Sequence, residues 1–233
     1  MTDSAPVIVE LEAVEKIYMQ GKIEVPALRG LDLEVRRGEF MALIGPSGSG
    51  KTTALNLIGG LDKPTRGRVV VDGDDLSTLS RGQLSRMRRD KIGFVFQAYN
   101  LVPVLSAYEN AEMVLRLQGV PLAERKQRVM QLLADVGLEG MEHRKPAEMS
   151  GGQQQRVAIA RAIAPGPVVT LADEPTANVD SATAEMLLTL MERLNRERDV
   201  TFIFSTHDPR VMARARRVVR MVDGKVDSDE RKD

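Results

Sequence analysis

The sequence predicts an α/β protein in which helices cover a mainly parallel β-sheet. A continuous apolar run, Phe40–Ile44, stands directly before a glycine-rich stretch, as expected of a strand buried on both faces. In the last third of the chain, strand-like apolar runs alternate with segments of helical periodicity, which is the βαβ rhythm of parallel sheets. The chain has 233 residues, 42% of them hydrophobic and 28% charged, which is typical of a globular protein with a sizeable core.

The N-terminal part predicts β structure. Val7–Leu11 is a short apolar strand, and Leu31–Val35 alternates apolar and acidic residues, as in a half-buried strand. After the apolar run and the glycine-rich stretch, Ala54–Ile58 predicts a helix that two glycines end. Arg68–Val71 predicts a further strand, closed by an Asp-Gly turn.

The middle of the chain predicts helices. Capping-box patterns begin helices at Ser80 and Ser106, with a strand, Ile92–Phe96, between them. Pro121 is predicted as the first residue of another helix, which Gly137 ends. The last third predicts the strands and helices Val168–Ala172, Asp180–Arg198, Thr201–Ser205, a short helix from Asp208, and Val218–Val222. The polar tail from Asp227 is predicted to be frayed.

Composition excludes several functional classes. Lys plus Arg and Asp plus Glu both number 33, so bulk charge does not favour nucleic-acid binding. The absence of Cys excludes disulfides, thiolate metal sites and a cysteine nucleophile. Aromatic residues, at 3%, are too scarce for a base-stacking platform. No apolar run approaches a membrane span and no secretory signal is evident, so we expect a cytosolic protein.

Residues 45–52 follow the phosphate-loop pattern of Gly, four residues, Gly, Lys and Ser/Thr, between a predicted strand and a predicted helix. Glycines let backbone N–H groups approach phosphate oxygens, and the helix N-terminus adds a favourable dipole. Lys51 supplies charge to the outer phosphates, and the Thr52 hydroxyl can ligate Mg²⁺. A glycine-rich surface turn is the alternative, which the strand–loop–helix context disfavours. The predicted phosphate-binding residues here are Gly45, Pro46, Ser47, Gly48, Ser49, Gly50, Lys51, Thr52 and Thr53.

Two carboxylates, Asp173 and Glu174, follow a predicted buried strand. An aspartate at the end of a parallel strand beside a phosphate loop can hold Mg²⁺, directly or through water. Glu174 is then placed to orient or deprotonate an attacking water. Such a pair can also be a simple strand end, but the upstream phosphate loop favours catalysis.

Met149–Gln153, with the helical run that follows, resembles the signature motif of ABC-type ATPases. Ser150 and Gln153 fit a capping box, and Gly151 and Gly152 would expose backbone N–H groups as an anion site. A capped helix without further function is the alternative, disfavoured by the phosphate loop and the acidic pair around it.

The resemblance to ABC ATPases covers essentially the whole chain and implies further site residues. Gln97 resembles the Q-loop glutamine that senses Mg²⁺ and the attacking water. Residues 177–180, ending in Asp180, resemble the D-loop at the dimer interface, and His207 resembles the switch histidine that contacts the γ-phosphate. Tyr18 resembles the aromatic residue that stacks on adenine, with a packing tyrosine as the alternative. Met149, Thr170 and Thr53 depart mildly from the family pattern, and none removes a catalytic group.

The resemblance implies a P-loop NTPase (RecA-like) core with an N-terminal antiparallel β subdomain and an inserted α-helical subdomain. One domain is expected over residues 1–233. Residues 1–96 and 166–233 would form the ATP-binding core with its β subdomain, and residues from about 98 to 165 the helical signature subdomain. The segments 57–67, 96–103 and 107–110 are most similar to the lipoprotein-release and macrolide-export branch.

The resemblance also implies function and partners. Two copies would close head-to-tail on two Mg²⁺–ATP as a homodimer and drive an integral membrane permease, at the cytoplasmic face of the inner membrane and without nucleic acid. The alternative is a cell-division-type ABC ATPase, which signals to an envelope hydrolase without moving cargo. A DNA-repair or chromosome-type ABC ATPase is disfavoured, because the chain lacks long heptad runs and Cys.

Overall fold

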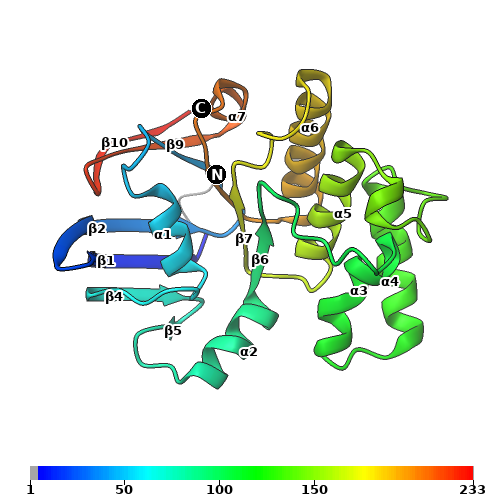
Figure 1. Ribbon diagram of the computed structural model, residues 1–233, viewed down its shortest axis with the longest axis horizontal. Coiled ribbons are helices and arrows are strands. Elements are labelled where there is room, and N and C mark those ends of the chain that lie inside the picture. The colour runs from blue at the N-terminus through cyan, green and yellow to red at the C-terminus, as the bar shows by residue number, and fades with distance from the viewer. Residues whose placement is uncertain (1–4, 233) are drawn as a thin grey trace.

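The computed structural model describes residues 5–232, which form two β-sheets and a group of helices packed beside them (Figure 1). The larger sheet has the order β10-β9-β3-β8-β7-β6, in which β10 alone runs antiparallel to its neighbour. Its strands are β3 (Phe40–Ile44), β6 (Ile92–Val95), β7 (Val169–Asp173), β8 (Phe202–Ser205), β9 (Arg217–Val222) and β10 (Lys225–Arg231). The predicted mainly parallel α/β core is confirmed.

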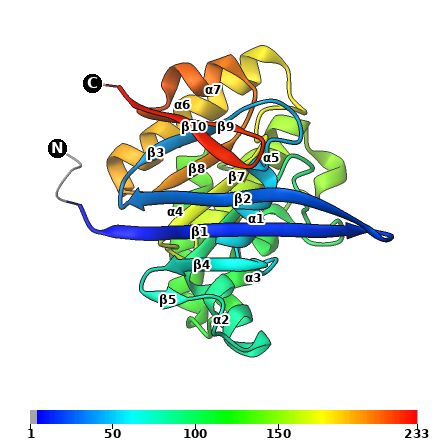
Figure 2. The same ribbon diagram turned by 90° about the vertical axis from the view of Figure 1, so that its left-hand side faces the viewer.

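The smaller sheet is antiparallel, with the order β2-β1-β4-β5. Its strands are β1 (Val7–Gln20), β2 (Ile23–Arg36), β4 (Arg66–Val71) and β5 (Asp74–Asp75). Figure 2 shows the long β1–β2 hairpin lying between β4 and the larger sheet. The prediction for β1 covered only its first residues, because the apolar run on which it depended ends at Leu11, where register shifts begin. At this irregularity the Asp32 carboxylate accepts the backbone N–H of Ala13, which has φ 45°.

The helices are α1 (Lys51–Ile58), α2 (Arg81–Lys91), α3 (Ala107–Leu117), α4 (Leu122–Asp135), α5 (Gly151–Ile163), α6 (Ser181–Arg198) and α7 (Pro209–Arg214), with a 3₁₀ turn at Pro146–Glu148. Helices α3, α4 and α5 pack together on the side of the molecule away from the β1–β2 hairpin (Figure 1). The capping boxes predicted at Ser80, Ser106 and Ser150 are all formed. Pro121 was predicted as the first residue of a helix. It is instead the N-cap of α4, which begins one residue later at Leu122, because the ψ of Pro121 is extended at 146°.

The alternating side chains of β3 enter two different cores. Phe40 and Ala42 belong to the core shared with α3–α6, whereas Met41 and Leu43 belong to the core beneath the small sheet and α1. All five residues of β3 are buried. A strand covered on both faces gains from apolar side chains at every position, which explains the continuous apolar run.

The prediction of a frayed tail from Asp227 is wrong. Lys225–Arg231 form β10, which pairs with β9 as an edge strand. The guanidinium of Arg217 donates to both carboxylate oxygens of Asp229, at 2.8 and 2.7 Å, and holds the pKa of that carboxyl below its usual value. An edge strand needs no apolar outer face when ladder hydrogen bonds and an ion pair anchor it, so polarity alone was a misleading signal.

Candidate functional site

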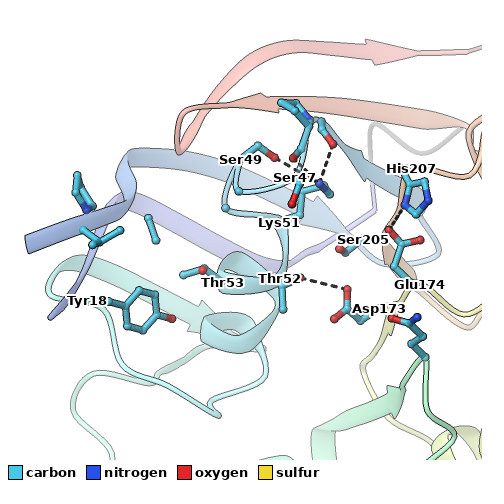
Figure 3. Close-up of a pocket in the computed structure, with 18 residues that line it drawn as sticks. Tyr18, Ser47, Ser49, Lys51, Thr52, Thr53, Asp173, Glu174, Ser205 and His207 are labelled. Atoms are coloured by element: carbon cyan, nitrogen blue, oxygen red, sulfur yellow. Dashed lines mark hydrogen bonds and ion pairs between the residues drawn. The ribbon is translucent and has the colours of Figure 1, made fainter. Parts of the chain in front are cut away.

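The phosphate loop joins β3 to α1, as predicted: residues 45–50 lie between the two elements, and Lys51 and Thr52 are the first residues of α1 (Figure 3). Gly45 has φ 148° and Gly50 has φ 99°. A Cβ atom would lie 2.2 Å from the carbonyl oxygen of Met221 at Gly45, and 2.6 Å from that of Ala27 at Gly50. Because backbone atoms cannot yield to such contacts, only glycine fits at either position.

Lys51 is the first residue of α1, and its side chain turns back across the loop (Figure 3). Its Nζ donates to the carbonyl oxygens of Gly45 at 2.8 Å and Pro46 at 3.0 Å. Gly50 is the N-cap of α1 and has no side chain with which to cap the helix. The first-turn N–H groups and the ammonium therefore offer positive potential to an anion at one place.

The acidic pair stands at the carboxyl end of β7. Thr52 Oγ1 donates to Asp173 Oδ1 at 3.4 Å, so the hydroxyl and the carboxylate converge from the phosphate loop and the sheet. Glu174 has φ 46°, and its backbone N–H donates to the carbonyl of Ser205 at the end of β8. This turn aims the Glu174 carboxylate toward the segment after β8, where His207 Nδ1 lies 2.6 Å from its Oε1 (Figure 3).

These residues line an open cleft of about 850 Å³. The described lining consists of Tyr18, Val25, Pro26, Ala27, Gly45, Pro46, Ser47, Gly48, Ser49, Gly50, Lys51, Thr52, Thr53, Gln97, Asp173, Glu174, Ser205 and His207. Tyr18 lies apart from the acidic pair, beyond Thr53 (Figure 3). Its hydroxyl donates to Asp62 at 3.0 Å, and burial, the largest cause, raises its pKa. One end of the cleft is therefore aromatic and apolar, and the other is charged.

The oxygen donors near the phosphate loop suit Mg²⁺. Across residues 5–232, no group of three or more His, Cys, Asp or Glu side chains could hold a metal ion. Beside the phosphate loop, the Thr52 hydroxyl lies 3.4 Å from the Asp173 carboxylate, and the Gln97 side chain also lines the cleft. Mg²⁺ commonly binds through one or two protein oxygens and completes its shell with phosphates and water, so this sparse set fits it.

The predicted signature residues and Asp180 are not among the described lining residues of the cleft. Ser150 is exposed and caps α5 by accepting the Gln153 N–H, while Gly151 and Gly152 form the first turn. Asp180 caps α6 through the backbone N–H and hydroxyl of Thr183. A single chain thus brings the phosphate loop, the acidic pair, Gln97 and His207 together and leaves the signature segment elsewhere.

Several cleft or supporting residues escaped the sequence analysis. Val25, Pro26 and Ala27 join the cleft because β1 pairs with β2, which places Val25 opposite Tyr18. No sequence pattern indicates that pairing. Thr206 supports the site, because its hydroxyl donates to Glu174 Oε2 at 3.1 Å. It stands directly before His207, and a polar pair after a buried strand could have identified it as a candidate site residue.

Within residues 5–232, the structure contains no helix long and apolar enough to cross a membrane.

Comparison with known proteins identifies close relatives. The sequence profile of the family described as "ABC transporter" matches residues 28–177. The lipoprotein-releasing system ATP-binding protein LolD of Anaeromyxobacter dehalogenans is 47% identical over 95% of this chain and 93% of its own length. The macrolide export ATP-binding/permease protein MacB of Syntrophobacter fumaroxidans is 47% identical over 95% of this chain, which spans only 31% of that relative.

A solved structure has the same fold. The dimeric post-hydrolysis structure of the ATP-binding cassette MJ0796 of Methanocaldococcus jannaschii, bound to ADP and Pi, superposes with a TM-score of 0.88. The two sequences are 43% identical, and the match covers 96% of this chain and 98% of the MJ0796 chain.

Proposed function

Because the chain belongs to the ABC transporter family of ATP-binding ATPases, we propose that it powers a transporter of the lipoprotein-release or macrolide-export type. The observation that supports its chemistry best is the convergence of Lys51, Asp173, Glu174 and His207 on one cleft. The similarity to LolD and MacB supports the choice of branch.

The proposed mechanism assigns each residue a task. Lys51 and the first-turn N–H groups of α1 bind the phosphates, and Tyr18 stacks on the adenine. Thr52 and Asp173 would hold Mg²⁺, which when bound would neutralise charge on the transferring phosphoryl group. Glu174 orients and deprotonates the attacking water, Gln97 would contact Mg²⁺ and that water, and His207 contacts the γ-phosphate.

We propose that a second copy of the chain completes the site. Its Ser150, Gly151, Gly152 and Gln153 would meet the nucleotide held by the phosphate loop of the first copy, with Asp180 at the interface. Two observations support this arrangement: the signature segment lies outside the cleft of its own chain, and MJ0796 was solved as a dimer. A nucleotide bound by both copies favours the closed dimer over the open one, and hydrolysis removes this stabilisation of the closed dimer.

The motion of the dimer is proposed to drive an integral membrane permease in a separate subunit, at the cytoplasmic face of the inner membrane. The helical segment from about residue 98 to 165 would transmit the motion, and residues 1–96 and 166–233 would form the ATP-binding core. The names of LolD and MacB support a membrane partner of the releasing or exporting kind. Co-purification of the chain with detergent-solubilised membranes tests this proposal, and recovery of an envelope-hydrolase regulator instead would favour the cell-division alternative.

The decisive experiment compares Glu174→Gln with wild type. The substitution keeps the shape of the side chain and removes the carboxylate. We expect the variant to bind ATP, lose Mg²⁺-dependent hydrolysis and accumulate as an ATP-bound dimer in size analysis. Glu197→Gln, on the exposed side of α6, is the matched control and should behave as wild type. Wild-type hydrolysis by Glu174→Gln would refute the assignment of the catalytic carboxylate.

A further inference from the structure

We infer that Thr206 is a positioning residue that holds the Glu174 carboxylate in place for water activation. This inference rests on the proposed role of Glu174. Thr206 follows β8 and is fully buried, at 0% exposure. Its Oγ1 donates to Glu174 Oε2 at 3.1 Å.

The direction of that hydrogen bond follows from what each of the two groups can donate and accept. The backbone N–H of Asp208 donates to Thr206 Oγ1 at 3.0 Å, so the oxygen already serves as an acceptor there. A hydroxyl has a single proton to donate, and an ionised carboxylate can only accept. The proton of Thr206 therefore points at Glu174.

The two oxygens of Glu174 are held by very different neighbours. His207, on Oε1, has a side chain that is 79% exposed and can turn away toward a nucleotide. Thr206, which donates to Oε2, is buried, and its backbone N–H donates to the carbonyl oxygen of Leu43 in β3. When His207 leaves, Thr206 keeps Oε2 in place and Oε1 becomes available to a water molecule.

A second link stiffens the same region. Thr176, two residues after Glu174, donates through Oγ1 to Asp208 Oδ2 at 2.7 Å. The segments after β7 and β8 are thus joined at Glu174–Thr206 and again at Thr176–Asp208. Glu174 itself has φ 46°, a left-handed conformation that a non-glycine residue keeps only when its surroundings hold it.

The test measures steady-state ATP hydrolysis by the full chain carrying Thr206→Val, Thr206→Ala or Thr206→Ser. Thr201→Val is the matched control, since Thr201 is also fully buried and its hydroxyl also accepts a backbone N–H, from Gly38 at 2.9 Å, without contact to Glu174. Glu174→Gln runs alongside. Thermal unfolding of every variant shows which are folded, and Thr206→Ala replaces Thr206→Val if the latter fails to fold.

Loss of the donor should lower kcat about tenfold or more, because a hydrogen bond to a charged group and accurate placement of a catalytic group are each worth that much. The KM for ATP should stay within about twofold, since Thr206 does not touch the bound nucleotide in the proposed mechanism. Thr206→Ser, which keeps the hydroxyl, should recover most of the activity. The ATP-bound dimer should accumulate in Thr206→Val, because hydrolysis is slowed while binding persists.

Three results would overturn the inference. Wild-type kcat in both Thr206→Val and Thr206→Ala, beside an inactive Glu174→Gln, would remove the role of Thr206 and leave the proposed function intact. An equal loss in Thr201→Val, or no recovery in Thr206→Ser, would show a general effect on the fold. Wild-type hydrolysis by Glu174→Gln would instead reject the proposed catalytic role of Glu174, on which this inference rests.

Discussion

Glu174 Oε1 and His207 Nδ1 lie 2.6 Å apart, and the two residues follow the neighbouring parallel strands β7 and β8. Their pairing places the proposed catalytic carboxylate beside an imidazole, at the end of the cleft that is proposed to hold the γ-phosphate. We expect His207→Ala to bind ATP normally and to lower kcat about 100-fold, the usual effect of removing one preorganised donor. Turnover and nucleotide-binding assays check this. His143→Ala, which changes the exposed second histidine, should be active.

Tyr18 should govern ATP affinity. Its ring lines the cleft, with Lys16 Nζ 4.9 Å from the ring centroid. Tyr18→Ala should raise the KM for ATP about tenfold with little change in kcat, because stacking on a base is worth roughly 1–3 kcal/mol. Tyr18→Phe keeps the ring and loses the hydrogen bond of the hydroxyl to Asp62, so it should stay near wild type. An unchanged KM in Tyr18→Ala, with lowered stability, would support the packing alternative.

Gly50→Ala should be severely destabilising or lose nucleotide binding. The new Cβ would lie 2.6 Å from the Ala27 carbonyl oxygen at a backbone φ of 99°. Gly73→Ala is the matched control, since Gly73 has φ 80° and a Cβ added there would meet no atom within 4 Å. Because alanine is strained in the left-handed region, Gly73→Ala should lower the free energy of unfolding by about 1 kcal/mol. Gly50→Ala should lower it considerably more, since its Cβ also meets the backbone. Urea unfolding and ATP binding distinguish the two, and equal costs would mean that the close approach is unimportant.

Arg161 should stabilise the segment after Gln97. This residue is 8% exposed, and its guanidinium donates to the carbonyls of Asn100 at 2.5 Å and Tyr99 at 2.8 Å, both of which have positive φ. Burial lowers the pKa of Arg161.

Arg161→Ala leaves two carbonyls unpaired, and we expect a loss of about 3 kcal/mol in the free energy of unfolding. Arg156→Ala, on the same helix and with longer contacts to the carbonyls of Val136 and Gly137, should cost less than about 1 kcal/mol. Urea denaturation measures both variants. Equal losses would argue against a special anchoring role for Arg161.

Asp208 should contribute stability that acid removes. The Arg210 guanidinium, the largest cause, and the Thr176 hydroxyl lower the pKa of Asp208 from 3.8 to about 2. A carboxyl whose pKa is lowered by folding stabilises the folded state at pH values above its pKa in the unfolded chain. That stabilisation is lost as the pH falls toward its pKa in the folded protein.

Asp208→Asn should therefore be less stable than wild type near neutral pH, by about 1 kcal/mol once solvent screening of Arg210 is allowed for. The difference should shrink between about pH 4 and pH 2. Chemical denaturation across this range gives the measurement. A difference that stays constant with pH would show that Asp208 acts through shape and not through charge.

Local chemistry explains what could be predicted from the sequence. The capping boxes at Ser80, Ser106 and Ser150 depend on residues three positions apart, and all three formed. The phosphate loop likewise requires only a strand, glycines at fixed spacing and a helix start. The burial of β3 was predictable because both of its faces meet apolar cores. In each case the determining contacts lie within a few residues or repeat along one element.

Long-range pairing explains what could not be predicted. β10 is stabilised by Arg217 and the β9 ladder, so its polar sequence carried no strand signal. The family motifs, the order of most strands and helices, and the residues of the phosphate loop could all be read from the chain alone. The meeting of Glu174 with both Thr206 and His207 could not, because it depends on β7 and β8 being adjacent in the sheet although these residues lie about thirty positions apart in the chain.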